Sequence, residues 1–65
     1  MTLLLNGASR DVAARTLAEA LDELGYAGKI VATAVNGAFV PARRRAECNL
    51  SDGDRIEVVA PMQGG

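Results

Sequence analysis

The residues best suited to take part in a chemical reaction are the last four of the sequence, Met62-Gln63-Gly64-Gly65. Because no residue follows Gly65, we expect its backbone carboxylate to be free, and we interpret it as the functional group. A terminal glycine has no side chain to crowd attack at the carbonyl, and a glycine before it lets the backbone pass through a narrow channel. The alternative is a frayed terminus without function, since the ends of most domains are poorly ordered. Which of these two interpretations holds depends on whether the fold fixes the base of this tail.

The remaining nucleophilic and acidic residues do not form a catalytic pattern. Ser9 and Ser51 have no histidine to act as a base, since the chain contains none. The single cysteine, Cys48, cannot form an internal disulfide, and we interpret it as a small, half-buried apolar residue. The acidic pair Asp52 and Asp54 lacks the rest of a calcium-binding loop and predicts a turn. We therefore expect no enzyme, no metal site and no bound cofactor.

Composition narrows the class of protein further. Sixty-five residues make a single domain, residues 1–65. A formal net charge of −1 gives no basis for nucleic-acid binding. No apolar run approaches the ~20 residues of a membrane span, and no charged-then-apolar signal segment opens the chain. With one cysteine and no disulfide, we expect a cytoplasmic protein without membrane partners.

The first half of the sequence predicts a hairpin followed by one helix. Two short runs, residues 2–5 and 9–12, flank Asn6-Gly7, the strongest short hairpin signal. Thr16 and Glu19 have the capping-box spacing, so each side chain should satisfy the other's backbone N–H. The helix that they begin has one apolar stripe, expected to enter the core, and should end at a glycine. The stripe residues are Leu17, Leu21 and Leu24, and the terminating residue is Gly25.

The second half predicts two strands, an irregular stretch and a final strand. Residues 30–35 are rich in β-branched residues and alanine and predict a buried strand. Asn36-Gly37 should turn the chain into a short return strand that ends at Pro41, which cannot donate a ladder hydrogen bond. Residues 42–49 should be irregular, and Leu50 should fill the core. After a turn at residues 51–54, residues 55–60 alternate, with Ile56, Val58 and Ala60 on one face of a half-buried strand.

This order of elements predicts an α+β fold. One helix cannot bury its stripe alone, so it should lie across one face of a four- to five-stranded mixed sheet. The final strand should lie inside that sheet and fix the base of a flexible tail, residues 61–65. Pro61 should stiffen the exit, so that Gly64 and Gly65 project from a rigid body.

Two features of the surface could dock a partner. Arg43, Arg44 and Arg45 could bind an acidic partner surface, although a solvated loop explains them as simply. Phe39, Val59 and Met62 could form an exposed apolar patch, or could pack at an edge of the sheet.

The chain resembles the ThiS family of sulfur carrier proteins, which have the β-grasp fold of ubiquitin-like proteins. Three stretches carry the resemblance: Val35-Asn36 followed by Val40-Pro41, Leu50 followed by the segment from Asp52 to Val58, and the terminal Gly64-Gly65. The sequence departs from the family's pattern at Ala42, which separates Pro41 from the arginines, and at Pro61-Met62-Gln63, where an aliphatic run is more usual.

The resemblance implies a protein substrate with three partners. An E1-like (ThiF-like) adenylating enzyme would activate the Gly65 carboxylate with ATP, and a persulfide protein would supply sulfur to give a thiocarboxylate. A ThiG-like thiazole synthase would then accept the sulfur for thiamin synthesis. Met62, Gln63 and Gly64 would be recognised as the tail. The small subunit of molybdopterin synthase, a ubiquitin-like protein modifier and a plain interaction domain remain as alternatives.

Overall fold

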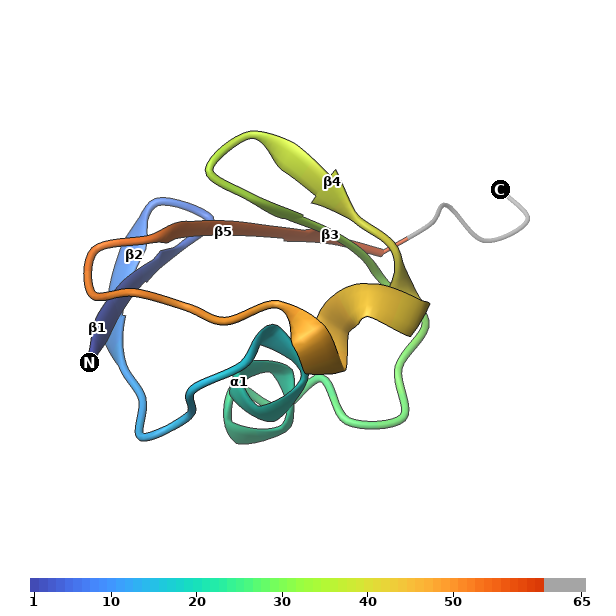
Figure 1. Cartoon of the computed structure of the whole chain (residues 1–65), viewed down its shortest axis with the longest axis horizontal. Helices are drawn as coiled ribbons and strands as arrows, with labels where there is room; N and C mark the ends of the chain where they lie inside the picture. The colour runs from blue at the N-terminus through green and yellow to red at the C-terminus, as the bar shows by residue number, and fades with distance from the viewer. Residues whose placement is uncertain (61–65) are drawn as a thin grey trace.

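The structure is a computed structural model that describes residues 1–60. Five strands form one sheet in the order β2-β1-β5-β3-β4, and one α-helix lies across one of its faces (Figure 1). β1 and β5 are parallel, while the other neighbouring strands are antiparallel. This confirms the predicted mixed sheet with one helix. The elements are β1 (Thr2–Leu5), β2 (Ala8–Asp11), α1 (Leu17–Glu23), β3 (Ala32–Val35), β4 (Ala38–Val40), the 3-10 helix η1 (Ala42–Glu47) and β5 (Arg55–Val59).

Both predicted hairpins close at their Asn-Gly pairs. Asn6 and Gly7 have φ values of 49° and 86°, and Asn36 and Gly37 have values of 51° and 85°. Positive φ at both central residues is the requirement of the type I′ turn, whose twist matches that of the flanking strands. Asparagine and glycine are the residues that adopt this conformation at least cost.

The start of helix α1 follows the predicted capping pattern with one difference. The Thr16 hydroxyl accepts a hydrogen bond from the Glu19 N–H at 3.2 Å. The Glu19 carboxylate, expected to bond the Thr16 N–H, instead accepts from the Arg15 N–H at 2.9 Å. It therefore satisfies the donor of the residue just before the N-cap.

Helix α1 ends at a glycine as predicted. Gly25 has a φ of +93°, and the Tyr26 N–H donates to the Leu21 carbonyl at 2.8 Å. This is the Schellman arrangement, which satisfies carbonyls that the helix leaves free at its end.

The core lies between helix α1 and one face of the sheet. Leu17, Leu21 and Leu50 come from the helix and the loops, and the side chains of Ile56 and Val58 meet them from β5. The other residues of β5 point to the opposite face, where no helix of the described chain covers the sheet (Figure 1). Neither helix within residues 1–60 is long and apolar enough to span a membrane.

Three sequence expectations were wrong in detail. The strand predicted at residue 30 begins at Ala32, and Ile30 is 79% exposed. The reason is that β5 ends at Val59, the partner of Ala32, so no β5 residue remains to pair with Ile30. Ala60, predicted on the buried face of the strand, is likewise exposed and lies outside it. Residues 42–47, predicted as irregular, form η1, whose first turn has the Arg44 N–H bonded to the Pro41 carbonyl at 2.9 Å.

Candidate functional site

The base of the predicted tail is the end of the central strand. β5 lies between β1 and β3 and runs to Val59, and Ala60 is the last described residue. The predicted tail residues Met62, Gln63, Gly64 and Gly65, together with Pro61, lie outside the described residues. A central strand is held along both edges, so the main chain enters this tail from a fixed position in the sheet.

One edge of the end of β5 is held by a side chain rather than by a strand. The Asn6 amide nitrogen donates to the Val58 carbonyl at 3.1 Å, and the Val58 N–H donates to the Asn6 Oδ1 at 2.9 Å. The backbone N–H of Asn6 donates to the Ile56 carbonyl at 2.9 Å. The sequence predicted only a turn at Asn6. No local signal could have shown this role, because the bonded residues are 52 positions apart.

The second Asn-Gly turn holds the start of β5 in a similar way. The Asn36 side chain donates to the Asp54 carboxylate at 3.0 Å and accepts from the Arg55 N–H at 2.9 Å. The other Asp54 oxygen accepts from the Ser51 N–H at 2.7 Å. Two hydrogen bonds lower the pKa of Asp54, because both favour the charged carboxylate: the larger effect comes from Asn36 and the smaller from Ser51.

An apolar patch lies on the uncovered face beside the end of β5. Phe39 is 69% exposed and Val59 is 61% exposed. The strand register places Phe39 opposite Ala34 and Val59 opposite Ala32, so two small alanines separate the two large side chains. Together with Glu57 these four residues line a shallow hollow, which we call the Phe39–Val59 patch. The structure thus brings together two of the three residues of the predicted patch, and Met62 lies outside the described residues.

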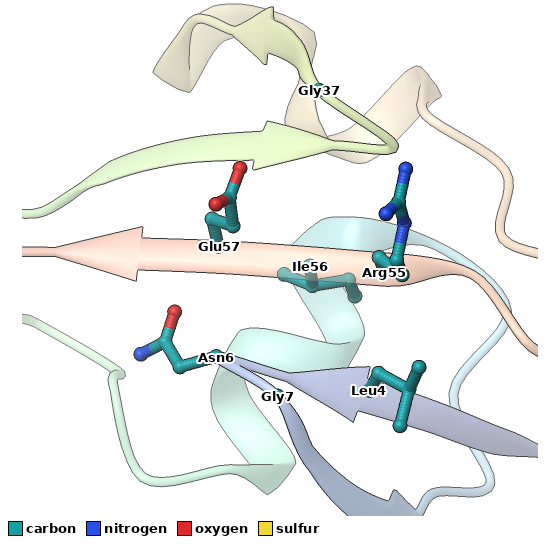
Figure 2. A pocket seen from close by; sticks show the side chains of 7 residues that line it. All are labelled: Leu4, Asn6, Gly7, Gly37, Arg55, Ile56 and Glu57. Atoms are coloured by element: carbon teal, nitrogen blue, oxygen red, sulfur yellow. The ribbon is translucent and has the colours of Figure 1, made fainter.

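A second hollow adjoins this patch along β5. It lies between the two Asn-Gly turns, and Glu57 lines both hollows. Figure 2 shows Arg55 and Glu57 projecting from β5 on the side of β3 and β4, while the Asn6 side chain points toward β5 from the end of β1. Glu57 was not among the predicted site residues, although the alternation of β5 places it on the same face as Val59.

The three consecutive arginines have different surroundings. Arg43 and Arg44 are exposed, and Arg44 forms an ion pair with Glu47 at 3.7 Å. Arg45 is half-buried, and its guanidinium donates to the Thr33 hydroxyl at 3.1 Å and to the Val31 carbonyl at 2.6 Å. Arg45 is therefore bonded within the fold, although the sequence predicted the same docking role for all three arginines.

Arg43 and Arg44 line a hollow together with Phe39, Glu47 and Cys48. The two exposed cations thus adjoin the Phe39–Val59 patch. Cys48 is half-buried and packs against the core. Among residues 1–60, no three histidine, cysteine, aspartate or glutamate side chains are grouped to hold a metal ion.

Comparison with known proteins identifies the family. The ThiS family model matches residues 3–65. The chain is 46% identical to the sulfur carrier protein ThiS of Thermus thermophilus, over 94% of this chain and 95% of that protein. The structure resembles the crystal structure of the thiamine biosynthesis protein ThiS from Geobacter metallireducens, with a TM-score of 0.84, 28% identity and full coverage of both chains.

A longer protein contains a similar stretch. The chain is 39% identical to a thiazole synthase of Paramagnetospirillum magneticum, over 100% of this chain but only 20% of the length of that protein. The full-length match to a carrier, the family model and the shared fold agree. This chain belongs to the ThiS family of sulfur carrier proteins, and it is a carrier rather than an enzyme.

Proposed function

We propose that this chain carries sulfur for the synthesis of the thiamin thiazole, as a thiocarboxylate on Gly65. The observation that carries the proposal is the match of the ThiS family model, which extends through Gly64 and Gly65. The fold supports it, because the central strand β5 leads into this segment and is held along both edges almost to its end.

The chemistry requires activation of the carboxylate by another protein. A carboxylate is a poor electrophile, since its negative charge repels nucleophiles. An E1-like (ThiF-like) enzyme transfers AMP from ATP to Gly65, which removes that charge and supplies a leaving group. The terminal sulfur of a persulfide protein then displaces AMP, and a thiol cleaves the resulting S–S bond to release the thiocarboxylate. ATP is bound by the enzyme rather than by this chain, and we place the cycle in the cytoplasm, where ATP is supplied.

The exposed residues near the base of the tail are the proposed docking surface. The Phe39–Val59 patch offers apolar area, and Arg43 and Arg44 beside it offer positive charge to an acidic partner. Exposed aromatic and aliphatic side chains grouped in this way are typical of interaction sites.

Thiazole synthase is the proposed sulfur acceptor. A stretch similar to the whole of this chain is present within the thiazole synthase of Paramagnetospirillum magneticum. Two modules that are joined in one protein often act together, and we extend that relationship to a separate ThiG-like partner of this chain. The molybdopterin synthase alternative uses the same tail chemistry, but the relatives described above are named for thiazole and thiamine biosynthesis.

Intact-mass analysis tests the proposal. The chain is incubated with ATP, the E1-like enzyme and a persulfide donor, and the expected product has one oxygen replaced by sulfur. Deleting Gly65 should abolish this product without changing the melting temperature, because the carbonyl would lie one residue, at most ~3.6 Å, short of the nucleotide. Gly64→Val should also fail, because its side chain would crowd the enzyme channel.

Two outcomes contradict the proposal. If the deletion variant still gains sulfur, the site lies elsewhere, and loss of that product in Cys48→Ala would identify a cysteine persulfide. If the wild-type chain instead becomes linked to protein lysines, it is a ubiquitin-like modifier.

A further inference from the structure

We propose that Asn6 is a positioning residue for the sulfur-carrying tail, because its side-chain amide completes the sheet beside the last residues of β5. This inference rests on the proposed function and deepens it. It concerns a residue of the first hairpin, far in sequence from the tail.

The edge of β5 that faces β1 lacks a strand partner at its end. The last residue of β1, Leu5, is the partner of Ile56. Asn6 follows with a φ of 49°, which turns the main chain away toward β2. The Val58 N–H and carbonyl therefore have no β1 residue opposite them.

The Asn6 side chain supplies the missing partner. A primary amide presents one acceptor and donors side by side, as a strand residue does. It accepts from the Val58 N–H at 2.9 Å and donates to the Val58 carbonyl at 3.1 Å. The amide thus extends the parallel pairing of β1 with β5 by one step.

The opposite edge of β5 also runs out of partners at this point. Val59 pairs with Ala32, the first residue of β3, and the preceding Ile30 is 79% exposed and outside the strand. The end of β5 is therefore held by the start of β3 on one side and by Asn6 on the other. Without the Asn6 amide, Val58 and Val59 at the end of β5 are held along the β3 edge only, and strand ends held in this way open more readily.

Positioning of the tail bears directly on its chemistry. The activating enzyme has to receive the tail in an orientation suited to reaction, and small misplacements of a reacting group cost large factors in rate. The direction in which the main chain leaves Ala60 sets where the tail can reach once the body of the carrier has docked.

Asn36 provides a matched control. It occupies the same position in the second Asn-Gly turn, with a φ of 51°, and its side chain also bonds β5. Its partner is Arg55, the first residue of that strand, at the end away from the tail. Asn6→Gly and Asn36→Gly should both keep the turn, because glycine accepts positive φ, and each loses one side-chain amide.

The experiment measures steady-state activation of full-length carriers by the E1-like enzyme, below their melting temperatures. We expect Asn6→Gly to lower kcat about tenfold, with KM for the carrier within about twofold, as when a reacting group is misplaced after docking. Asn36→Gly should change both constants by less than about twofold. If the substitutions acted only by destabilising the fold, they would increase the unfolded fraction of the carrier. The apparent KM would then rise in both variants, and kcat would not fall.

Amide hydrogen exchange gives an independent measurement. Relative to the amide of buried Leu3, Val58 should exchange at least about tenfold faster in Asn6→Gly, while Asn36→Gly should leave Val58 unchanged. Unchanged Val58 exchange, or a kcat for Asn6→Gly equal to that for Asn36→Gly, overturns the inference while leaving the sulfur carrier function intact. A wild-type chain that gains no sulfur refutes the proposed function itself.

Discussion

Arg45→Ala should destabilise this protein far more than substitution of either neighbouring arginine. The guanidinium of Arg45 joins η1 to β3 through its bond to the Thr33 hydroxyl at 3.1 Å, and to the residue before that strand through its bond to the Val31 carbonyl at 2.6 Å. A hydrogen bond that involves a charged group contributes ~1.5–3 kcal/mol, so two contribute roughly 3–6 kcal/mol. Ordering a long arginine side chain costs up to ~2 kcal/mol, and the half-exposed site lets water replace part of the remainder. We therefore expect a loss of about 2 kcal/mol.

That loss is large for a chain of this size. At ~0.05–0.15 kcal/mol per residue, the whole domain has a free energy of unfolding on the order of 3–10 kcal/mol. For a domain this small, each 1 kcal/mol lowers the melting temperature by roughly 4–8 °C. The melting temperature of Arg45→Ala should therefore fall by roughly 8–16 °C.

Urea denaturation and thermal melting followed by circular dichroism measure the effect. Arg44→Ala is the control, since it removes only the ion pair with Glu47, whose side chains are 66% and 72% exposed. Such surface pairs contribute ~0–1 kcal/mol. Arg45→Lys should recover part of the loss, because an ammonium keeps the charge but lacks the planar fork that reaches both acceptors. Equal stabilities for Arg45→Ala and Arg44→Ala would refute this assignment of the bonds.

Three further predictions follow from the same structure. Leu21→Ala should cost ~2–5 kcal/mol, because Leu21 is 5% exposed in the core, and a melting curve like that of the wild type would show that the helix stripe is misassigned. The pKa of Asp54 is lowered in the folded chain, so the charged carboxylate stabilises the fold at pH values above its ordinary pKa of 3.8, and this stabilisation is lost as the pH falls through the lower folded pKa. Asp54→Asn should therefore flatten the plot of unfolding free energy against pH in this acid range. An unchanged slope in that range would contradict the prediction. Replacing Arg43 and Arg44 together with alanine should weaken binding to the E1-like enzyme and reduce its salt dependence, with kcat at saturating carrier retained; a fall in kcat with unchanged binding would exclude a docking role.

The sequence by itself determined the local elements of this protein. Both Asn-Gly turns, the helix that begins after Thr16 and ends at Gly25, and the alternation in β5 formed as predicted. These signals are local, because each rests on the backbone conformation that a residue favours or on the period of a strand or helix. The resemblance to the ThiS family also came from motifs that are continuous in the sequence, and the comparisons confirmed it.

The tertiary structure alone decided which of these elements meet at the base of the tail. Only the strand order places the end of β1 beside β5, and so gives the Asn6 amide its partner at Val58. Only the tertiary structure brings the Arg45 guanidinium to the Thr33 hydroxyl and the Val31 carbonyl, and so separates Arg45 from the two exposed arginines that precede it. The partner of a side chain in the fold depends on strand pairings between residues that are far apart in sequence. Such pairings cannot be predicted from the local sequence pattern around either partner.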